Sequence, residues 1–454
     1  MSNILEEFLE IESNPQILDY KIDGIPLWLL VRHYVIWNLQ KEKFGLEEPH
    51  VQIKFNTLKL KEKLRYFYWT LRKTPFFAPK RDILIFGSAG DNVYENERYF
   101  NKLYYQIINN FEGVLLEQSF KWKFFLPKLE NTFYIRDSVE IIRFLFSKLI
   151  SLNNDEKKLL KDFVKNFNLQ DILDLKYVEK IIKTQKAKKA IYKILLRKIK
   201  PRLLILECAH YMGDLPILLL AKEMGIITAE YQHGYIGKDH IAYNFHPNII
   251  EKIKPFVPEY FLTWGRYWSN NVNTPSKKVA IGFGYLEEKN KNKINKKKKI
   301  LVVISGGNMP MEYNQYAKQI KEMFKDYKLL IRPHPSERPQ ALQRYKNMLN
   351  LGFSIDFSDL YNELLPNVDV MISFEKSTVL YEALFFTSNV FLVDLKNLFF
   401  DDDLPFKYFS DFDEFKNFLK NSSNFTGSIE KEFFFSKGFV KNFNDFLKMV
   451  LGGK

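Results

Sequence analysis

Short apolar runs, each followed by a turn and then by a helical stretch, recur through this chain and constrain its fold more than any other feature. Runs of about four to eight apolar residues between turn signals are typical of strands covered on both faces. Strands that alternate with helices indicate a parallel sheet. The runs are Asp82 to Phe86, Gly113 to Leu116, Leu203 to Cys208, Ile226 to Glu230, Tyr260 to Trp264, Val279 to Ile281, Lys299 to Ile304, Tyr327 to Arg332 and Val368 to Ser373.

The runs fall into two groups, separated by a lysine-rich segment at 289–299 that has the character of an exposed, extended linker. At about 150 residues per domain, a chain of 454 residues is expected to form two or three units. We therefore predict an α/β fold of two Rossmann-like domains that face a cleft, at 82–288 and 300–454. A helical N-terminal extension at 1–81 and a helical insertion at 138–200 complete the predicted organisation.

The composition favours a cytoplasmic protein. No uninterrupted apolar run approaches the roughly 20 residues that span a bilayer. The N-terminal residues Met1 to Glu7 are acidic and lack the basic and apolar regions of a signal peptide. Cys208 is the single cysteine, so no intrachain disulfide can form, and its apolar surroundings predict a small buried residue.

The net charge of +14 is concentrated in two segments. Residues 54–82 carry nine Lys or Arg against Glu62 and Asp82, a surplus of seven, and residues 289–299 carry seven Lys and no acid. These two surpluses account for the whole excess, so the rest of the chain is balanced. A diffuse nucleic-acid-binding surface is therefore not expected.

The first basic segment contains an amphipathic helix between residues 57 and 73. Leu60, Leu64, Phe67 and Leu71 form one stripe, and basic residues surround it. Such a helix, within residues 54–73, can lie on an anionic membrane surface. A helix that packs on the core and solvates its basic face explains the pattern equally well.

Candidate ligand-binding residues follow the strands of the second group. Two prolines flank His334 in the turn after Arg332, which presents the imidazole at the carboxyl end of a strand, where open α/β sheets bind ligands. Ser377 and Thr378 begin an apolar helix, where an anion is favoured, and Glu382 lies on the same helical face to accept hydrogen bonds from a ribose.

Each of these residues also has a structural interpretation. Arg332 either contacts a phosphate or pairs with a carboxylate, and its turn can serve only to end the strand. Ser377 and Thr378 can cap the helix, and Glu382 can be solvated. A further predicted turn contains Gly306 and Gly307, which are also candidates for binding the nucleotide.

In the first group, His233 is the candidate for the reacting centre. A neutral imidazole with a pKa near ~6.5 can accept a proton from an attacking hydroxyl, and Gly234 leaves space beside it. The alternative is a structural histidine bonded to a backbone carbonyl. Gln232, Gly234, Lys238 and His240 are auxiliary candidates, and Lys238 and His240 either bind an anionic ligand or belong to a solvated loop.

Several other site classes lack their sequence signatures. Four of the seven histidines lie between 210 and 246, but none has a metal-ligand spacing, so no metal and no cofactor are predicted. Asp401, Asp402 and Asp403 are interpreted as a solvated loop. The chain contains neither G-x-G-x-x-G nor a P-loop, which argues against a nucleoside triphosphatase.

Three of these motifs resemble those of GT-B-type transferases of bacterial surface polysaccharides. They are Arg332-Pro333-His334-Pro335, Ser377-Thr378 with Glu382-Ala383-Leu384, and Gln232-His233-Gly234. The family includes the Kdo and sialic acid transferases of capsule synthesis and, more distantly, the CDP-glycerol glycerophosphotransferases of teichoic acid synthesis. The resemblance covers roughly residues 203–395.

The resemblance implies a metal-independent glycosyltransferase in which the first domain receives the acceptor and the second holds a nucleotide-sugar donor. His233 would act as base and His334 would contact the donor phosphate. A CMP-linked acidic sugar such as Kdo is favoured, with a polysaccharide or lipid-linked glycan as acceptor. Polyol-phosphate transfer from a CDP-linked donor, nucleotide-sugar epimerisation and non-catalytic glycan binding remain the alternatives.

Overall fold

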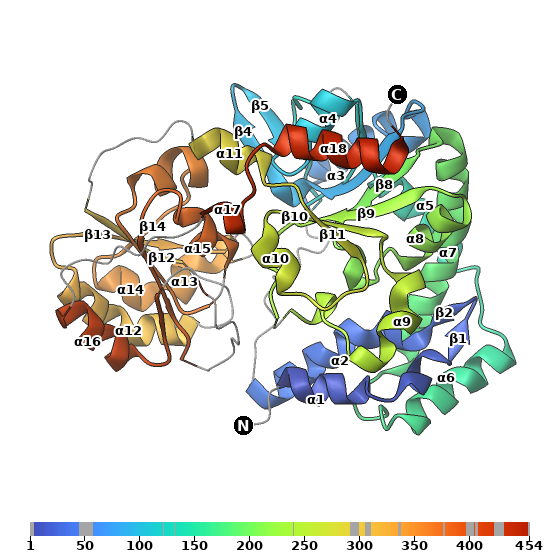
Figure 1. Ribbon diagram of the computed structural model, residues 1–454, viewed down its shortest axis with the longest axis horizontal. Helices are drawn as coiled ribbons and strands as arrows, with labels where there is room; N and C mark the ends of the chain where they lie inside the picture. Colours follow the sequence, from blue (N-terminus) through green and yellow to red (C-terminus); the bar gives the residue numbers. More distant parts are fainter. Residues whose placement is uncertain are drawn as a thin grey trace.

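The computed structural model describes residues 4–44, 58–120, 122–130, 132–238, 240–290, 299–304, 310–334, 337–375, 377–395, 404, 407–421 and 431–452. It contains two α/β domains, each built on a parallel sheet (Figure 1). The predicted fold class, with its helical extension and its helical insertion, is confirmed. The described helices include none that is both long enough and apolar enough to cross a membrane.

The first sheet has seven parallel strands in the order β11-β10-β9-β8-β3-β6-β7. The chain fills one side from β3 to β7 and then the other side from β8 to β11, so the order reverses between β3 and β8. Open α/β sheets bind ligands beyond the carboxyl ends of the strands at such a reversal. The strands are β3 (Ile83–Ser88), β6 (Val114–Gln118), β7 (Phe133–Ile135), β8 (Leu203–Leu206), β9 (Ile227–Tyr231), β10 (Tyr260–Thr263) and β11 (Lys277–Ala280).

The second sheet repeats this arrangement with six parallel strands in the order β14-β13-β12-β15-β16-β17. Its order reverses between β12 and β15. The strands are β12 (Ile300–Ile304), β13 (Lys328–Arg332), β14 (Ser354–Ile355), β15 (Val370–Ser373), β16 (Asn389–Val393) and β17 (Lys407–Phe409).

The apolar runs are buried as the sequence predicts. All four residues of β8 and of β15 are buried, because helices cover both faces of each sheet. The sequence prediction did not include β7, β14, β16 and β17. Three of these, β7, β14 and β17, have only two or three residues, which is too short for a hydrophobic period to show.

The remaining elements of the first domain are mostly helical. The N-terminal extension forms α1 (Ile4–Ile11), η1 (Pro15–Leu18), the hairpin of β1 (Lys21–Ile22) and β2 (Ile25–Pro26), α2 (Leu27–Phe44), α3 (Leu60–Arg72) and η3 (Pro75–Phe77). Beyond β3 lie η4 (Ala89–Asp91), the hairpin of β4 (Asn92–Glu95) and β5 (Arg98–Asn101), and α4 (Tyr105–Phe111). The insertion forms α5 (Asp137–Ser147), α6 (Asn154–Asn166) and α7 (Leu175–Ile199). The later elements are η5 (Ala209–Tyr211), α8 (Leu215–Glu223), η6 (Ile241–Tyr243), η7 (Pro247–Ile249), α9 (Ile250–Ile253), η8 (Lys254–Phe256), α10 (Arg266–Asn270) and α11 (Gly284–Asn290).

The second domain has shorter helices between its strands. They are α12 (Pro310–Met323), η9 (Arg338–Gln340), α13 (Ala341–Arg344), α14 (Lys346–Asn350), η10 (Leu360–Leu364), η11 (Leu365–Asn367), α15 (Thr378–Ala383) and α16 (Phe412–Asn421). The apolar helix predicted to begin at Ser377 and Thr378 is α15, which ends at Ala383.

The C-terminal helices α17 (Lys431–Phe434) and α18 (Phe439–Leu451) return to the first domain, and Figure 1 shows α18 lying along it. α18 packs against α4 and α11, and the indole Nε1 of Trp268 donates to the carbonyl of Phe434 at 2.7 Å. The sequence prediction placed all of 300–454 in the second domain. We propose instead that the second domain ends before Lys431.

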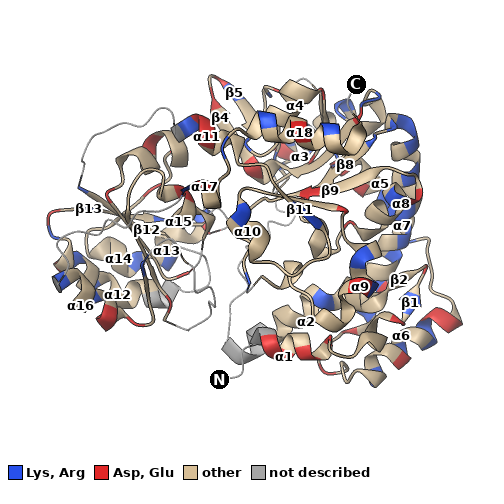
Figure 2. Ribbon diagram, viewed as in Figure 1, with Lys and Arg blue, Asp and Glu red and all other residues tan. Residues whose placement is uncertain are grey.

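Helix α3 presents its apolar stripe outward. Leu60, Leu64 and Leu71 are 72%, 62% and 69% exposed, whereas Tyr66 and Thr70 on the opposite side are buried. Packing of the leucine stripe on the core is therefore the wrong interpretation, because the side of α3 that carries Tyr66 and Thr70 makes the core contact. Figure 2 shows that Lys and Arg are spread over both domains, and α3 adds basic residues around its exposed leucines.

Candidate functional site

Polar side chains collect beyond the carboxyl ends of β3, β8 and β9, where the first sheet reverses its order. Asp91 ends the turn after β3, Glu207 and Cys208 follow β8, and His233 follows β9. Parallel strands end at one edge, so residues far apart in sequence become neighbours there. This edge is the candidate active site of the first domain.

His233 is held at this edge as a neutral imidazole. Its Nε2 lies 3.5 Å from Sγ of Cys208, and its buried Nδ1 has no hydrogen-bond partner among the described residues. Burial lowers the pKa of His233, and the nearby carboxyls of Glu230 and Asp91 offset part of this shift. A neutral imidazole with an unused nitrogen can exchange a proton with a ligand.

Asp91 and Glu207 form a carboxyl pair beside His233. Burial raises the pKa of Asp91, although Lys102 and His233 act against that shift, and Asp91 is hydrogen-bonded to Glu207. Burial and the charge of Asp91 raise the pKa of Glu207. Two adjacent, partly buried carboxyls favour retention of one proton, so the pair carries less than two charges.

Sequence reasoning missed this pair, although its signal was present. Gly87 and Gly90 mark a turn at the end of β3, and Asp91 is the next residue along the chain. Glu207 is the penultimate residue of the run from Leu203 to Cys208. A charged residue just after the carboxyl end of a parallel strand indicates a candidate site residue, because ligands bind at that edge of the sheet.

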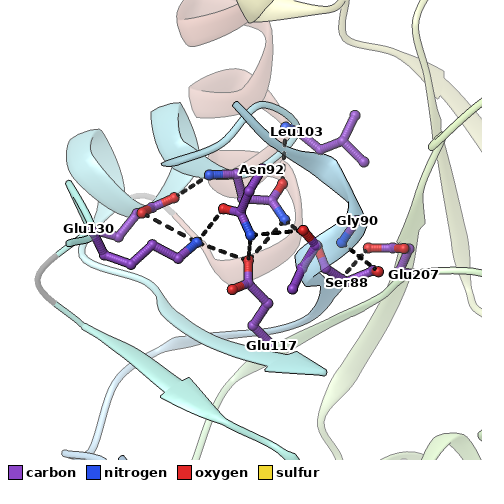
Figure 3. Close-up of polar contacts among 10 residues, drawn as sticks. Ser88, Gly90, Asn92, Leu103, Glu117, Glu130 and Glu207 are labelled. Carbon is purple, nitrogen blue, oxygen red and sulfur yellow. Dashed lines mark hydrogen bonds and ion pairs between the residues drawn. The ribbon is translucent and has the colours of Figure 1, made fainter. Parts of the chain in front are cut away.

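A second polar network supports the turn that carries Asp91 (Figure 3). Glu117, at the end of β6, accepts hydrogen bonds from Asn92 at 3.0 Å and from Lys128 at 2.9 Å. Lys128 also lies 3.7 Å from Glu130, and these three charged side chains are almost fully buried. The backbone N–H of Ser88 donates to Glu207 at 2.9 Å, which ties β3 to the carboxyl pair.

A buried His210–Glu230 pair lies behind the site. His210 Nδ1 is bonded to Glu230, and its Nε2 lies 2.9 Å from Oγ1 of Thr274. Burial acts to raise the pKa of Glu230, but His210 and the hydroxyl of Tyr243 lower it overall. Glu230 therefore stays ionised and supplies a fixed negative charge near His233.

The second domain meets this edge at the start of α15. A Cβ placed on Gly234 would lie 4.0 Å from Cγ2 of Thr378. The rings of Tyr235 and Tyr381 stack with centroids 6.0 Å apart and planes 23° apart. The Gln-His-Gly turn and the Ser377-Thr378 segment, both identified from sequence, therefore lie side by side.

Glu382 lies at the boundary between the domains and is buried, not solvated. It accepts a hydrogen bond from the hydroxyl of Tyr361 at 2.9 Å, and Lys102 of the first domain reaches the same hydroxyl at 3.2 Å. Burial raises the pKa of Glu382, while Lys102 and Tyr361 act to lower it. The solvated interpretation of Glu382 is wrong, because it lies against Tyr361 and not on an exposed face.

The other predicted donor residues have mixed surroundings. Arg332 lies 2.6 Å from Asp356 and also donates to the carbonyl of Ser358, so its guanidinium is engaged within the domain. His334 is exposed, and its backbone N–H donates to Glu337 at 3.1 Å. Ser377 accepts from the backbone of Val379 at 3.4 Å, as a helix cap does. Gly306 and Gly307 lie outside the described residues.

The auxiliary candidates of the first domain also differ from one another. Gln232 is buried, with its amide donating to the carbonyl of Gly234 at 2.9 Å and accepting from the backbone of Trp264 at 2.8 Å, so it shapes the turn. Lys238 is exposed. Burial lowers the pKa of His240 to about 3. The ring of His240 is therefore neutral near pH 7, and its auxiliary role stays a prediction.

The described residues contain no group of three or more His, Cys, Asp or Glu arranged to hold a metal ion. Asp401, Asp402 and Asp403 lie outside the described part of the chain. Metal independence stays a prediction.

Comparison with known proteins gives distant structural similarity. No protein-family model matches the chain, and no curated protein matches it. Among solved structures, a UDP-GlcNAc 2-epimerase from Methanocaldococcus jannaschii in complex with UDP-GlcNAc and UDP is 11% identical, with a TM-score of 0.45, over 82% of this chain and 99% of that one. The wall teichoic acid polymerase TagF is 11% identical, with a TM-score of 0.37, over 86% and 92%. The glycosyltransferase SsfS6 from Streptomyces sp. SF2575 is 11% identical, with a TM-score of 0.32, over 69% and 81%.

Proposed function

We propose that this protein is a glycosyltransferase that moves a sugar from a nucleotide-activated donor to a polysaccharide or glycolipid acceptor. The observation that carries the proposal is the position of His233. It is a neutral imidazole with a buried, unpartnered nitrogen, and the next residue, Gly234, lies against Thr378 at the start of a helix in the other domain. One turn thus places a candidate base beside a candidate phosphate-binding segment.

In the proposed reaction, the acceptor hydroxyl transfers its proton to Nδ1 of His233 as its oxygen forms a bond to the anomeric carbon. The bond from that carbon to the donor phosphate oxygen breaks, and the nucleotide leaves with the electron pair. The new imidazolium is stabilised by the carboxylate of Glu230 and by the negative charge of the Asp91 and Glu207 pair. A single displacement of this kind inverts the anomeric carbon.

The donor is proposed to bind the second domain. Ser377 and Thr378 would present backbone and hydroxyl groups to its phosphate, His334 would add a hydrogen bond, and Glu382 would face the ribose. Arg332, Gly306 and Gly307 belong to the same proposed site. Within this class we favour a CMP-linked acidic sugar such as Kdo, which follows from the resemblance of the motifs.

We also propose that α3 brings the enzyme to an anionic membrane surface on the cytoplasmic side, where lipid-linked acceptors are found. The exposed stripe of Leu60, Leu64 and Leu71 among basic residues supports this role. Apolar side chains would enter the interface while Lys and Arg contact anionic headgroups.

Three alternative functions would use the same residues. In a CDP-polyol phosphotransferase, the acceptor oxygen would attack a phosphorus atom of the donor instead of an anomeric carbon. An epimerase would interconvert free nucleotide sugars with no acceptor present. A glycan-binding protein would bind acceptor and release no nucleotide.

A panel of nucleotides tests the proposal. CMP or CDP is expected to raise the melting temperature, and His334→Ala is expected to weaken this shift because one phosphate contact is lost. The measurement is differential scanning fluorimetry with CMP, CDP, UDP, GDP and ADP. Absence of a shift with every nucleotide would refute the donor site.

Replacement of His233 separates binding from chemistry. His233→Ala is expected to lower turnover by about 10² to 10⁴-fold, because proton transfer is lost, while the nucleotide-induced melting shift is retained. Release of nucleotide from CMP-linked and CDP-linked donors in the presence of glycan acceptors measures turnover. Unchanged turnover would remove His233 from the mechanism.

A further inference from the structure

Three histidines surround one tyrosine beside the proposed base. The ring of His33, from α2, stacks on Tyr211 with centroids 4.5 Å apart and planes 4° apart. The rings of His233 and His240 meet Tyr211 edge-on at 5.9 Å and 5.5 Å. The hydroxyl of Tyr211 lies 2.8 Å from Nε2 of His240. The N-terminal extension, predicted only as a helical preface, thus contributes a side chain to the site.

Each of these imidazoles retains an unused nitrogen. His33 Nε2, His233 Nδ1 and His240 Nδ1 are buried and have no hydrogen-bond partner among the described residues. Most buried polar atoms in native proteins are hydrogen-bonded, and an unsatisfied one costs about 1–3 kcal/mol. Three such atoms around a single tyrosine are candidates for hydrogen bonds with a ligand.

The imidazoles in this group carry no charge at neutral pH. Burial, with smaller contributions from Arg32 and His240, lowers the pKa of His33 to about 3. Burial, together with His233, lowers the pKa of His240 to about 3. Arg32, whose charge contributes to the lowered pKa of His33 and His240, is already engaged by Glu12 and by the backbone carbonyls of Ile241 and Asn244. Neutral donors and acceptors suit hydroxyl groups, whereas a phosphate or carboxylate would need a cation.

The group is also held rigidly. The amide of Asn244 donates to the carbonyls of Gly237 and His240 at 2.8 Å and 2.9 Å, which fixes the loop that carries His240. The neighbouring Arg32 ties α2 to the same loop. A site on rigid elements binds with less loss of conformational freedom.

We propose that His33, His240 and Tyr211 form, together with His233, a subsite for an uncharged, hydroxyl-rich part of the acceptor, namely a sugar ring. This inference rests on the proposed function, because it places the acceptor beside the base. It assigns His33 and His240 as specificity-determining residues for a glycan over a polyol phosphate. It also gives the N-terminal extension a binding role.

Ligand-observed saturation-transfer NMR on the full-length protein tests the subsite. The probes are methyl glucoside, methyl galactoside and glycerol 3-phosphate. Saturation of the methyl glycosides is expected with the natural protein, and loss of one hydrogen bond in His33→Ala is expected to weaken binding about 2- to 10-fold. Tyr211→Phe, which keeps the stacked ring and removes only the hydroxyl that holds His240, is expected to weaken it by a similar factor.

His246→Ala is the matched control. Its ring caps a turn by accepting from the backbone of Asn248 at 3.2 Å and makes no ring contact with Tyr211 among those described. Glycoside binding is expected to stay unchanged in this variant. Equal glycoside saturation in the natural protein, His33→Ala and Tyr211→Phe would overturn the proposal, as would saturation of glycerol 3-phosphate alone or of none of the probes.

The nucleotide-induced melting shift distinguishes this failure from failure of the proposed function. The shift is expected to persist in His33→Ala, Tyr211→Phe and His246→Ala, because none of these residues belongs to the second domain. A persistent shift without glycoside binding would overturn the subsite and leave the donor site standing. Absence of the shift in the natural protein would refute the function itself.

Discussion

Replacement of Arg32 by methionine tests how the N-terminal extension is fixed to the first domain. Arg32 is 1% exposed and lies 2.5 Å from Glu12, whose side chain is fully buried. Its guanidinium also donates to two backbone carbonyls of the loop at 241–244 and lies 4.2 Å from the ring centroid of Phe245. Loss of the guanidinium therefore removes the hydrogen bonds that Arg32 donates to a buried carboxylate and to two carbonyls.

The expected cost follows from these contacts. Removing one partner of a buried ion pair costs about 3–5 kcal/mol, because the remaining charge is uncompensated. Glu12 keeps the indole of Trp28 at 2.8 Å and the backbone N–H of His246 at 3.1 Å. Because these two donors still stabilise the carboxylate of Glu12, the loss of unfolding free energy in Arg32→Met is expected near the lower end of that range, at about 3 kcal/mol.

Urea denaturation followed by tryptophan fluorescence measures this loss, since Trp28 is part of the network. Arg202→Met is the matched control, because Arg202 pairs with Asp82 at 3.4 Å on an exposed surface, where such pairs contribute about 0–1 kcal/mol. The double variant Glu12→Leu with Arg32→Met is expected to recover part of the stability, since no charge is left buried. A loss no larger than that of Arg202→Met would refute the reasoning.

Two further predictions concern pH and membranes. The pKa values of His33 and His240 are lowered to about 3 in the folded protein, so the unfolded chain binds more protons than the folded one below pH ~6.5. The free energy of unfolding is therefore expected to fall as the pH falls from ~6.5 towards ~3. The loss is up to ~1.4 kcal/mol per pH unit for each ring. Urea denaturation from pH 7.5 to 5.0 checks this, and a His33→Gln, His240→Gln variant with an unchanged slope would contradict it. Co-sedimentation with phosphatidylglycerol-containing vesicles is expected at low salt and not with phosphatidylcholine alone. Leu64→Glu or Leu71→Glu should weaken vesicle binding about tenfold or more. Leu342 is 72% exposed in the second domain, and Leu342→Glu should leave vesicle binding unchanged. Equal effects of all three variants would refute a role for α3.

Hydrophobic pattern was enough to predict the two-sheet architecture. A run such as Leu203 to Leu206 can be covered only between helices, and its repetition with intervening helices leaves a parallel sheet as the simple solution. The direction of the strands then placed His233 and Thr378 at carboxyl edges, where open sheets bind ligands. These conclusions depend on local sequence, because a strand that is buried on both faces is apolar at every position.

Pattern could not decide which side of α3 faces the core. Its leucine stripe and its Tyr66 side both satisfy a helical period, and the choice depends on the hydrogen bond from Tyr66 to Asp137 at 2.8 Å, across 71 residues of sequence. The charge of His240 was equally undetermined. An isolated histidine titrates near ~6.5, and only burial beside other rings makes it neutral.

The sequence by itself determined two parallel sheets, a basic helix and two short loops with histidines. Only the tertiary structure decided which side chains meet: His33 with Tyr211, Asp91 with Glu207, and Lys102 with Tyr361 across the domain boundary. Strand and helix periods act over a few residues, and the sequence therefore reveals them. Proximity of distant residues and the loss of water around them arise only when the chain folds, and these two effects set the charges and contacts of the site.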